Sequence, residues 1–390
     1  MHFLTMKTLL MLVLVSIPLA FGQTFKTEPL ANPAGAGGLQ PNWSVTPGGG
    51  ALLSWIEPSK GGFSSLRYAV RNGANWSEPH TIAAQRHFFR HPAELPEVAQ
   101  LSEHQWMAHW VEMPKEESEA EYVYTSASTD GVNWTMPTMA HHDRAPVQHG
   151  LASMVASGAG ETSVFWLMAG QNEEGPTALM RTIVDASGKE IREERLAPDV
   201  CACCPTAVAK TSKGLLLAYR AHTPQDIRDI SVLRFENGKW SQPKNLYADN
   251  WKINACPTNA ASVAAAGDRV AISWFTSAQD MPKTEVAFST DSGSTFTKPA
   301  TVSTGHSFGY TSVVLDEGGA IVSWLEQGAG GGAARVLVRQ VSFSGSAGPV
   351  LQVAEGGRMA LGYPRLFHSG ADTFIAWGDP KRLQTARLKK

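Results

Sequence analysis

The stretch ALLSWIEP, residues 51–58, reads as a short apolar strand that carries an aromatic residue before it enters a polar loop. Six later stretches of the chain have the same form. Successive equivalents lie between 50 and 56 residues apart, at Trp55, Trp110, Trp166, Tyr219, Trp274, Trp324 and Trp377. Periods of this length indicate propellers or solenoids, in which each repeat buries its apolar face against its neighbours.

Each repeat is predicted to hold four short strands. In the first repeat these are residues 42–47, 51–57, 65–71 and 76–82, and the turn before the last one contains Asn72-Gly73, a strong hairpin signal. The strands are rich in Val, Ile, Trp and Thr, which favour β-structure. The sequence therefore predicts an all-β fold, a β-propeller of four-stranded antiparallel blades. We expect seven blades, with six as the alternative.

The seventh repeat is incomplete. Residues 363–389 supply only three strands before the sequence ends. We predict that residues 24–31, TFKTEPLA, add the missing outer strand and close the ring of blades.

Residues 1–22 have the pattern of a secretory signal peptide, with Lys7, a short apolar run and a small-x-small cleavage site. The apolar run is too short to span a membrane. We therefore expect residues 23–390 to form one exported propeller domain, periplasmic or extracellular, that acts as a monomer. A net charge of -2 without long basic runs argues against nucleic acid or an anionic membrane as the main partner.

Two segments resemble a known turn. Residues 289–296, STDSGSTF, resemble the Asp-box of sialidases and related BNR-repeat proteins, and residues 128–134, STDGVNW, resemble a shortened copy. The order Cys-x-Cys-Cys, RDI, single Cys and Asp-box is similar to a bacterial group described as exo-α-sialidase-like. The resemblance implies a sialidase-like propeller over the whole mature chain, although an Asp-box specifies a fold far better than an activity.

The same resemblance implies a set of catalytic candidates. In sialidases, arginines bind the substrate carboxylate, an aspartate is the acid and a tyrosine is the nucleophile. Residues 89–92 are the nearest match to the family's Phe/Tyr-Arg-Ile-Pro motif, with His91 in place of isoleucine. The candidates in this chain are Arg90, Arg220, Arg228, Arg365, Asp226, Asp229, Tyr363 and Tyr310. For the segment QDIRDI, residues 225–230, the alternative is an Arg–Asp pair that only fixes its loop.

Histidines and cysteines concentrate in the loops that lead into the inner strand of each blade. In a propeller these loops share one face, and we expect this loop-rich face to carry the functional site. The residues aligned just before the inner strands are Gln40, His91, His149, Cys204, Cys256, Gly309 and Tyr363. The loop histidines His87, His141 and His142 are expected to be solvated.

The four cysteines admit three interpretations. In the first, the cysteines form disulfides, either Cys204–Cys256 or another pairing among Cys201, Cys203, Cys204 and Cys256. The sequence alone does not choose among these pairings. The second interpretation is a copper or zinc site at the channel mouth, because thiolates and imidazoles suit these ions. Its ligands would be His91, His149, Cys204 and Cys256. The third is a redox or catalytic role.

Two functions follow from these patterns. The first is an exported propeller that binds an anionic glycan or small acid on its loop-rich face; if it also hydrolyses the glycan, it is an exo-α-sialidase-like glycoside hydrolase. The second is a non-enzymatic propeller that binds copper or zinc, or a protein partner, at the Cys/His ring. A thiol count and a metal analysis of the purified protein distinguish the two.

Overall fold

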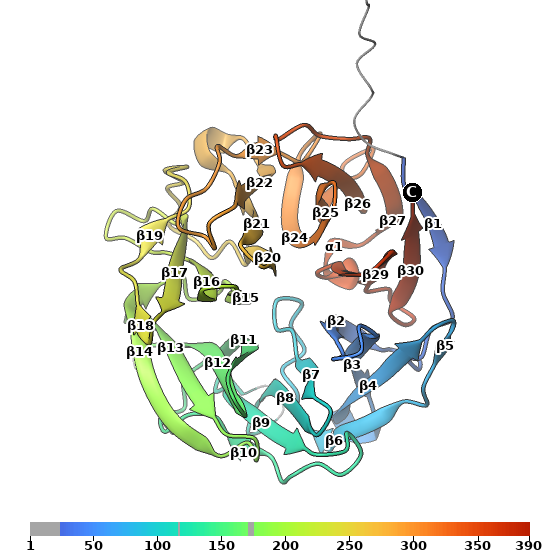
Figure 1. Cartoon of the computed structure of the whole chain (residues 1–390), viewed down its shortest axis with the longest axis vertical. Coiled ribbons are helices and arrows are strands. Elements are labelled where there is room, and N and C mark those ends of the chain that lie inside the picture. The colour runs from blue at the N-terminus through green and yellow to red at the C-terminus, as the bar shows by residue number, and fades with distance from the viewer. Residues whose placement is uncertain (1–23, 116–117, 171–174) are drawn as a thin grey trace, which may run out of the picture.

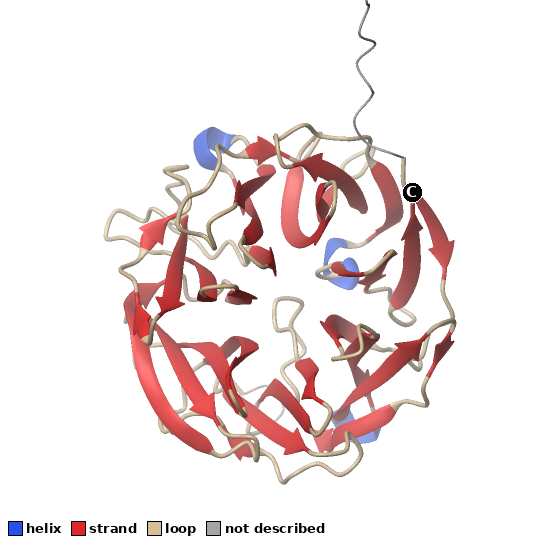
Figure 2. Ribbon diagram, in the orientation of Figure 1, coloured by secondary structure: helices blue, strands red, loops and turns tan. Residues whose placement is uncertain are grey.

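The computed structural model describes residues 24–115, 118–170 and 175–390. Seven separate antiparallel sheets follow one another around a ring, so the protein is a seven-bladed β-propeller (Figure 1). Figure 2 shows that strands provide nearly all of its regular structure. The predicted all-β fold with seven blades is confirmed. The predicted signal peptide, residues 1–22, lies outside the described residues.

Each blade runs from an inner strand near the axis to an outer strand at the rim. Blades 1 to 3 comprise β2 (Leu39–Val45), β3 (Ala51–Pro58), β4 (Ser64–Asn72), β5 (Asn75–Trp76) and β6 (His80–Arg86); β7 (Glu97–Ser102), β8 (Gln105–Glu112), β9 (Tyr122–Ser128) and β10 (Thr138–Met139); and β11 (His149–Gly158), β12 (Glu161–Met168), β13 (Thr177–Val184) and β14 (Glu190–Val200). Blades 4 to 6 comprise β15 (Ala207–Thr211), β16 (Gly214–Arg220), β17 (Ile230–Glu236), β18 (Lys239–Trp240) and β19 (Lys244–Asn245); β20 (Ser262–Ala266), β21 (Arg269–Thr276), β22 (Lys283–Ser289) and β23 (Ala300–Thr301); and β24 (Ser307–Asp316), β25 (Gly319–Gln327), β26 (Ala334–Ser342) and β27 (Leu351–Gly356).

Blade 7 contains strands from both ends of the chain. It comprises β28 (Arg365–Ser369), β29 (Asp372–Trp377), β30 (Gln384–Lys389) and β1 (Lys26–Pro29). Strand β1 pairs antiparallel with β30, and Lys26 lies opposite Lys389. This pairing confirms the predicted ring closure and gives blade 7 four strands, as in blades 2, 3, 5 and 6.

In residues 24–115, 118–170 and 175–390, helical structure is limited to three short segments. They are α1 (Arg358–Leu361), just before blade 7, and the single turns η1 (Lys60–Gly62) and η2 (Ala278–Asp280). Within the described residues, no helix has both the length and the apolar character that a membrane crossing requires.

The repeated aromatic residues pack between blades. Trp55, Trp110, Trp166, Trp274 and Trp324 are among the largest fully buried side chains of the protein. Their indole N–H groups also have partners, which a buried indole needs. For example, Trp55 Nε1 donates to Glu57 Oε2 at 2.9 Å. The aromatic residues whose spacing predicts the fold are therefore the residues that pack between the blades.

The segment STDSGSTF forms a tight turn between β22 and β23. The Asp291 carboxylate accepts hydrogen bonds from the backbone N–H of Thr295 at 2.9 Å and from the hydroxyls of Ser289 and Thr295 at 2.7 Å. Gly293 has a φ of 82° and leaves room for the Leu216 side chain of the neighbouring blade. Asp130 caps the corresponding turn in blade 2.

Replacing Asp291 with alanine removes the acceptor of three turn hydrogen bonds. We expect the free energy of unfolding to fall by about 1–2 kcal/mol, since the turn is at the surface and water replaces part of the loss. Urea unfolding of Asp291→Ala beside wild type measures this change, and Glu103→Ala, at an exposed position, is the control for loss of a carboxylate. A change below about 0.3 kcal/mol would show that the carboxylate does not stabilise the turn.

Candidate functional site

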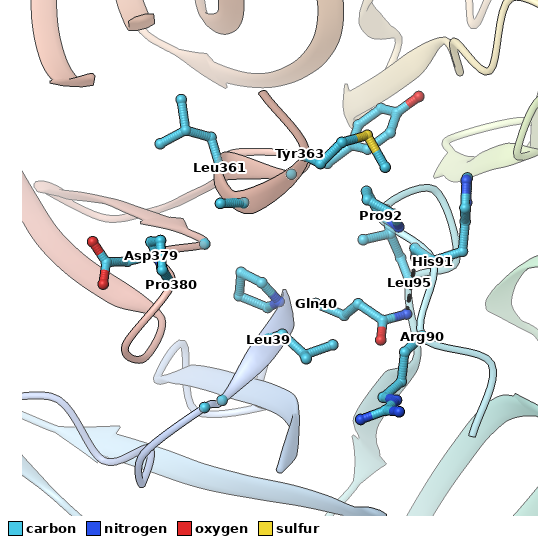
Figure 3. A pocket seen from close by; sticks show the side chains of 17 residues that line it. Leu39, Gln40, Arg90, His91, Pro92, Leu95, Leu361, Tyr363, Asp379 and Pro380 are labelled. Carbon is cyan, nitrogen blue, oxygen red and sulfur yellow. Dashed lines mark hydrogen bonds between the residues drawn. The ribbon is translucent and has the colours of Figure 1, made fainter. Parts of the chain in front are cut away.

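The loop-rich face contains a cavity of about 240 Å³ between blades 1, 2 and 7. It is lined by residues 37–41 of blade 1, by 90–92 and Leu95 before blade 2, and by 359–363 and 378–380 around the inner end of blade 7. Figure 3 shows these segments facing one another across the cavity. Figure 1 shows the loop before β7 reaching toward the middle of the ring.

Gln40 connects two walls of this cavity. Its side-chain Nε2 donates to the backbone oxygens of Phe89, His91 and Glu94, at 3.2, 3.1 and 2.5 Å. Its Oε1 is buried and has no hydrogen-bond partner among the described residues. A buried acceptor without a donor is costly, so this oxygen is available to a ligand hydroxyl.

Arg90 lies at the edge of the cavity and is exposed to solvent. Among the described residues it forms no ion pair. Figure 3 shows the side-chain oxygen of Gln40 on the side of the cavity where Arg90 lies. A free guanidinium and an unpartnered acceptor at the same cavity suit a ligand that carries both an acidic group and a hydroxyl.

His91 lines the cavity and also stabilises its loop. Its Nδ1 accepts a hydrogen bond from the backbone N–H of Ala93 at 3.2 Å, and its ring stacks on Phe89 with centroids 5.6 Å apart. Burial lowers the pKa of His91. The ring is therefore neutral at pH 7, and Arg90 supplies the positive charge of this wall.

Tyr363 is one of the residues that line the cavity, but its hydroxyl and its ring are engaged by the protein. Its hydroxyl donates to Thr258 O at 2.8 Å and accepts from the N–H of Ala260 at 3.0 Å. Its ring packs against Tyr310, with centroids 4.5 Å apart, and burial raises the pKa of Tyr363 well above its usual value. Neither tyrosine hydroxyl has a carboxylate partner among the described residues. The geometry gives no support to either as a nucleophile.

The four candidate arginines lie in four different places. Arg365 faces a cavity of about 190 Å³ in the channel and donates to Asn42 Oδ1 at 3.1 Å. Arg228 lines a separate cavity of about 540 Å³ at blades 3 and 4. Arg220 is 2% exposed, and its donors go to backbone carbonyls. Arg90 therefore stands alone at its cavity, and the structure does not assemble a cluster of arginines around one carboxylate.

The two candidate aspartates also lie in different places and make different contacts. Asp226 lines the 540 Å³ cavity, where His222 lies between Asp226 Oδ1 at 3.4 Å and Asp199 Oδ1 at 2.9 Å. Asp229 is buried and accepts the backbone N–H groups of Asn250 and Trp251, both at 3.0 Å. Asp229 thus holds a loop through backbone N–H groups, and among the described residues it forms no ion pair with an arginine, unlike the Arg–Asp pair of the alternative.

The cysteines form one group of four at the start of blades 4 and 5. Cys203 and Cys256 are joined by a disulfide, not Cys204 and Cys256. Cys204 and Cys201 are both buried thiols, with Sγ atoms 3.1 Å apart. The predicted equivalence of Cys204 and Cys256 is wrong, because Cys204 lies three residues before the first residue of β15 and Cys256 lies six residues before that of β20. The side chain of Cys204 contacts Cys201, whereas the half-buried Cys203 is bonded to the exposed Cys256.

The two free thiols differ in acidity. The hydrogen bond with Cys204 and the nearby charge of Arg220 lower the pKa of the Cys201 thiol to about 6. Burial raises the pKa of Cys204 well above its usual value. Cys201 is therefore the more acidic thiol of this pair.

The structure does not bring His91, His149, Cys204 and Cys256 together. Cys256 is oxidised, and His149 is buried with its Nδ1 bonded to the backbone oxygens of Glu121 and Val147, both at 3.0 Å. Within the described residues, two other groups place three ligand atoms within 4.8 Å of one another. They are Cys201, Cys203 and Cys204, and the surface set His142, Glu190 and Glu193.

His141 is buried, so the prediction that it is solvated is wrong. Its ring stacks on His149, with centroids 4.3 Å apart and the planes within 5°. Its Nε2 accepts the backbone N–H of Val123 at 3.2 Å. Burial, with the neighbouring His149, lowers the pKa of His141 to about 3, so the ring is neutral and structural.

The sequence patterns do not single out two buried carboxyl groups. Glu94 is 1% exposed and Glu121 is 5% exposed, and both approach the same small space above Gly150. Burial raises the pKa of Glu94 to about 8, with a contribution from the Glu121 charge, and burial raises that of Glu121 to about 7. The backbone N–H of Leu151 donates to Glu94 Oε2 at 2.6 Å. Glu94 thereby anchors the base of the loop that forms one wall of the cavity.

The comparisons with known proteins identify the fold. No family model matches the chain, and no curated protein matches it in sequence. A lectin from Burkholderia pseudomallei is 14% identical, with 89% of this chain and 95% of that chain covered and a TM-score of 0.56. A polysaccharide lyase described as an ulvan lyase is 10% identical, with 92% of each chain covered and a TM-score of 0.55.

The NanB sialidase from Streptococcus pneumoniae is also similar. It is 12% identical, with 93% of this chain and 71% of that chain covered and a TM-score of 0.45. That score is too low to support an argument about the site. The lectin and the lyase establish a shared propeller fold, and a shared fold does not specify an activity.

Proposed function

We propose that this protein binds a sugar that carries an acidic group, in the cavity between blades 1, 2 and 7. One observation carries the proposal: the buried, unpartnered Oε1 of Gln40 lies in the same cavity as the unpaired guanidinium of Arg90. A sugar hydroxyl would donate to Gln40, and a carboxylate or sulfate would bind Arg90 through paired N–H donors.

The apolar lining of the cavity suits the C–H faces of a sugar ring. Pro41, Pro92 and Leu95 contribute to two of the walls, and Pro380 contributes to the third. Ligand pockets commonly combine a mostly apolar lining with a few fixed polar groups that set orientation. The cavity volume of about 240 Å³ fits one monosaccharide unit rather than a long chain.

Binding without cleavage is the simpler activity for this cavity. Most glycoside hydrolases use two carboxyl groups on either side of the scissile bond. Asp379 is the only carboxylate that lines this cavity among the described residues. Two of the proteins that share the fold are a lectin and a polysaccharide lyase, so this architecture hosts both binding and cleavage of glycans. We also propose that the protein is exported to the periplasm or the cell exterior, where such glycans occur.

Replacing Arg90 with alanine should weaken binding of an acidic sugar by about 10- to 100-fold, which is the effect of losing one charge-assisted contact. Isothermal titration with glucuronic acid and with N-acetylneuraminic acid measures the affinity. The uncharged methyl glucoside should bind wild type and Arg90→Ala equally weakly.

The exposed Arg195→Ala on β14 is the matched control, because it removes the same charge from a different blade. Equal affinity of wild type, Arg90→Ala and Arg195→Ala for both acids would refute the site. Absence of acid binding by wild type would refute the function.

A further inference from the structure

The four cysteines place a disulfide in contact with a dithiol. Cys201 Sγ lies 3.1 Å from Cys204 Sγ and 3.9 Å from Cys203 Sγ, and Cys203 is bonded to Cys256. All four sulfurs therefore form one continuous chain of contacts. Thiol–disulfide exchange requires this proximity, because a thiolate must reach one sulfur of a disulfide directly.

The two pairs differ in their access to solvent. Cys201 and Cys204 are each 1% exposed, whereas Cys203 is half-buried and Cys256 is exposed. An exchange of partners would therefore transfer two thiols from the interior to the loop-rich face. In the present state the reactive thiols are enclosed and the surface sulfurs are oxidised.

The surroundings favour Cys201 as the attacking sulfur. The positive charge of Arg220 and a hydrogen bond from the Arg228 side chain both favour the Cys201 thiolate, and the peptide N–H of Cys201 donates to Arg220 O at 3.0 Å. Cys203 Sγ accepts a weak hydrogen bond from the N–H of Thr258 at 3.4 Å. That bond would favour negative charge on Cys203 when it leaves.

We propose that these cysteines form a thiol–disulfide exchange site that interconverts a Cys203–Cys256 disulfide and a Cys201–Cys204 disulfide. In the first step the Cys201 thiolate attacks Cys203 Sγ. The Cys203–Cys256 bond breaks, its electron pair stays on Cys256, and Cys256 takes a proton from water. In the second step Cys204 loses its proton and attacks Cys201 Sγ, and Cys203 leaves as a thiolate that is then protonated.

The exchange needs no external oxidant or reductant. One disulfide and two thiols are present before and after it, so the number of electrons held by the four sulfurs is constant. Its result is a surface dithiol, Cys203 and Cys256, which can reduce a small disulfide from solvent. A cavity of about 540 Å³ is lined by Ala202 and Asn254, which lie within two residues of Cys203 and Cys256 along the chain, and it would give such a molecule room. The site is separate from the proposed sugar cavity.

The test is differential alkylation of the full, purified protein without reductant. The native protein is incubated with iodoacetamide at mildly alkaline pH, then denatured in acid, and the remaining thiols are labelled with N-ethylmaleimide. Mass spectrometry of the peptides identifies each label. We expect iodoacetamide to accumulate on Cys203 and Cys256 with time, leaving a Cys201–Cys204 disulfide.

Two variants separate the steps. Cys201→Ser removes the attacking sulfur, and labelling of Cys256 should fall by at least about tenfold. Cys204→Ser permits the first step only, so Cys256 should be labelled while Cys203 remains bonded to Cys201. Circular dichroism checks that each variant is folded. The wild-type time course tests the exchange even if a variant does not fold.

Two results would overturn the proposal. If native wild type carries iodoacetamide on none of its cysteines, and N-ethylmaleimide appears only on Cys201 and Cys204 after denaturation, the disulfide is static and structural. If Cys256 is labelled as fast in Cys201→Ser as in wild type, Cys201 is not the attacking sulfur. Neither result bears on sugar binding, which depends on Arg90 and Gln40.

Discussion

Replacing Arg220 with methionine is expected to lower the free energy of unfolding by about 3–5 kcal/mol. The guanidinium is buried and donates to the backbone oxygens of Asn259, Arg228 and Phe275, at 3.1, 2.7 and 2.9 Å. It also stacks over Trp251 at 5.0 Å from the ring centroid. Methionine fills similar space but leaves three carbonyls without their donor, and each loss costs about 1–3 kcal/mol before any relaxation.

Urea unfolding followed by tryptophan fluorescence measures this change, provided that the m-value stays constant. The free energy of unfolding of Arg220→Lys should lie at best between those of wild type and Arg220→Met, because one ammonium group cannot reproduce the planar fork of a guanidinium. The exposed Arg195→Met is the control for loss of an arginine. A decrease below about 1 kcal/mol for Arg220→Met would mean that water or a side-chain shift satisfies these carbonyls.

The second large effect is a loss of stability as the pH rises through neutrality. The pKa values of Glu94 and Glu121 are raised to about 8 and about 7 in the folded protein, above the ordinary value of 4.5. The folded state therefore holds these protons more tightly than the unfolded state. Their stabilising contribution is complete below pH 4.5 and is lost as the pH rises through 7 and 8.

Glu94→Gln isolates one of these groups because an amide imitates the protonated acid at every pH. Each group changes stability by about 1.4 kcal/mol per pH unit while only the unfolded state is ionised. We expect Glu94→Gln to unfold with nearly wild-type free energy at pH 5 and to be more stable than wild type by about 3–5 kcal/mol at pH 9.

Taking the difference between the two proteins at each pH removes the contribution of His141. The pKa of His141 is lowered to about 3, so its contribution to stability has the opposite sign and is lost as the pH falls toward 3. Glu317→Gln, at an exposed position, is the control for the loss of a carboxylate. A pH-independent difference between Glu94→Gln and wild type would show that Glu94 is ionised throughout.

The sequence predicts the fold because the fold depends on a repeated, buried residue type. Seven aromatics at a constant period, from Trp55 to Trp377, require seven equivalent packing positions, and the structure provides them. The pairing of the two chain ends is also predictable, since the last repeat lacks one strand. Both inferences depend only on strand count and burial, which the residue pattern encodes directly.

The site is less predictable because it depends on the direction of individual side chains. The repeated Cys-Pro-Thr suggests that Cys204 and Cys256 are equivalent, yet they precede their inner strands by different numbers of residues, and the adjacent Cys203 forms the bond. The arginines are on the expected face, but Arg220 turns into the core while Arg90 faces solvent. Glu94 and Glu121 carry no distinguishing sequence signal, because an acidic residue in a loop is usually solvated.

The pairing of β1 with β30 has a consequence for the order in which the molecule assembles. These strands lie at opposite ends of the described chain, so blade 7 is completed only after the last strand has left the ribosome. The proposed sugar cavity is built from segments that meet only there: residues 37–41 belong to blade 1, and residues 359–363 and 378–380 belong to blade 7. The cavity is therefore the last part of the protein to form. Binding of the proposed sugar would then report whether the ring of blades has closed, and a chain that ends after blade 6 would keep most of its sheets but lack the blade 7 wall of this cavity.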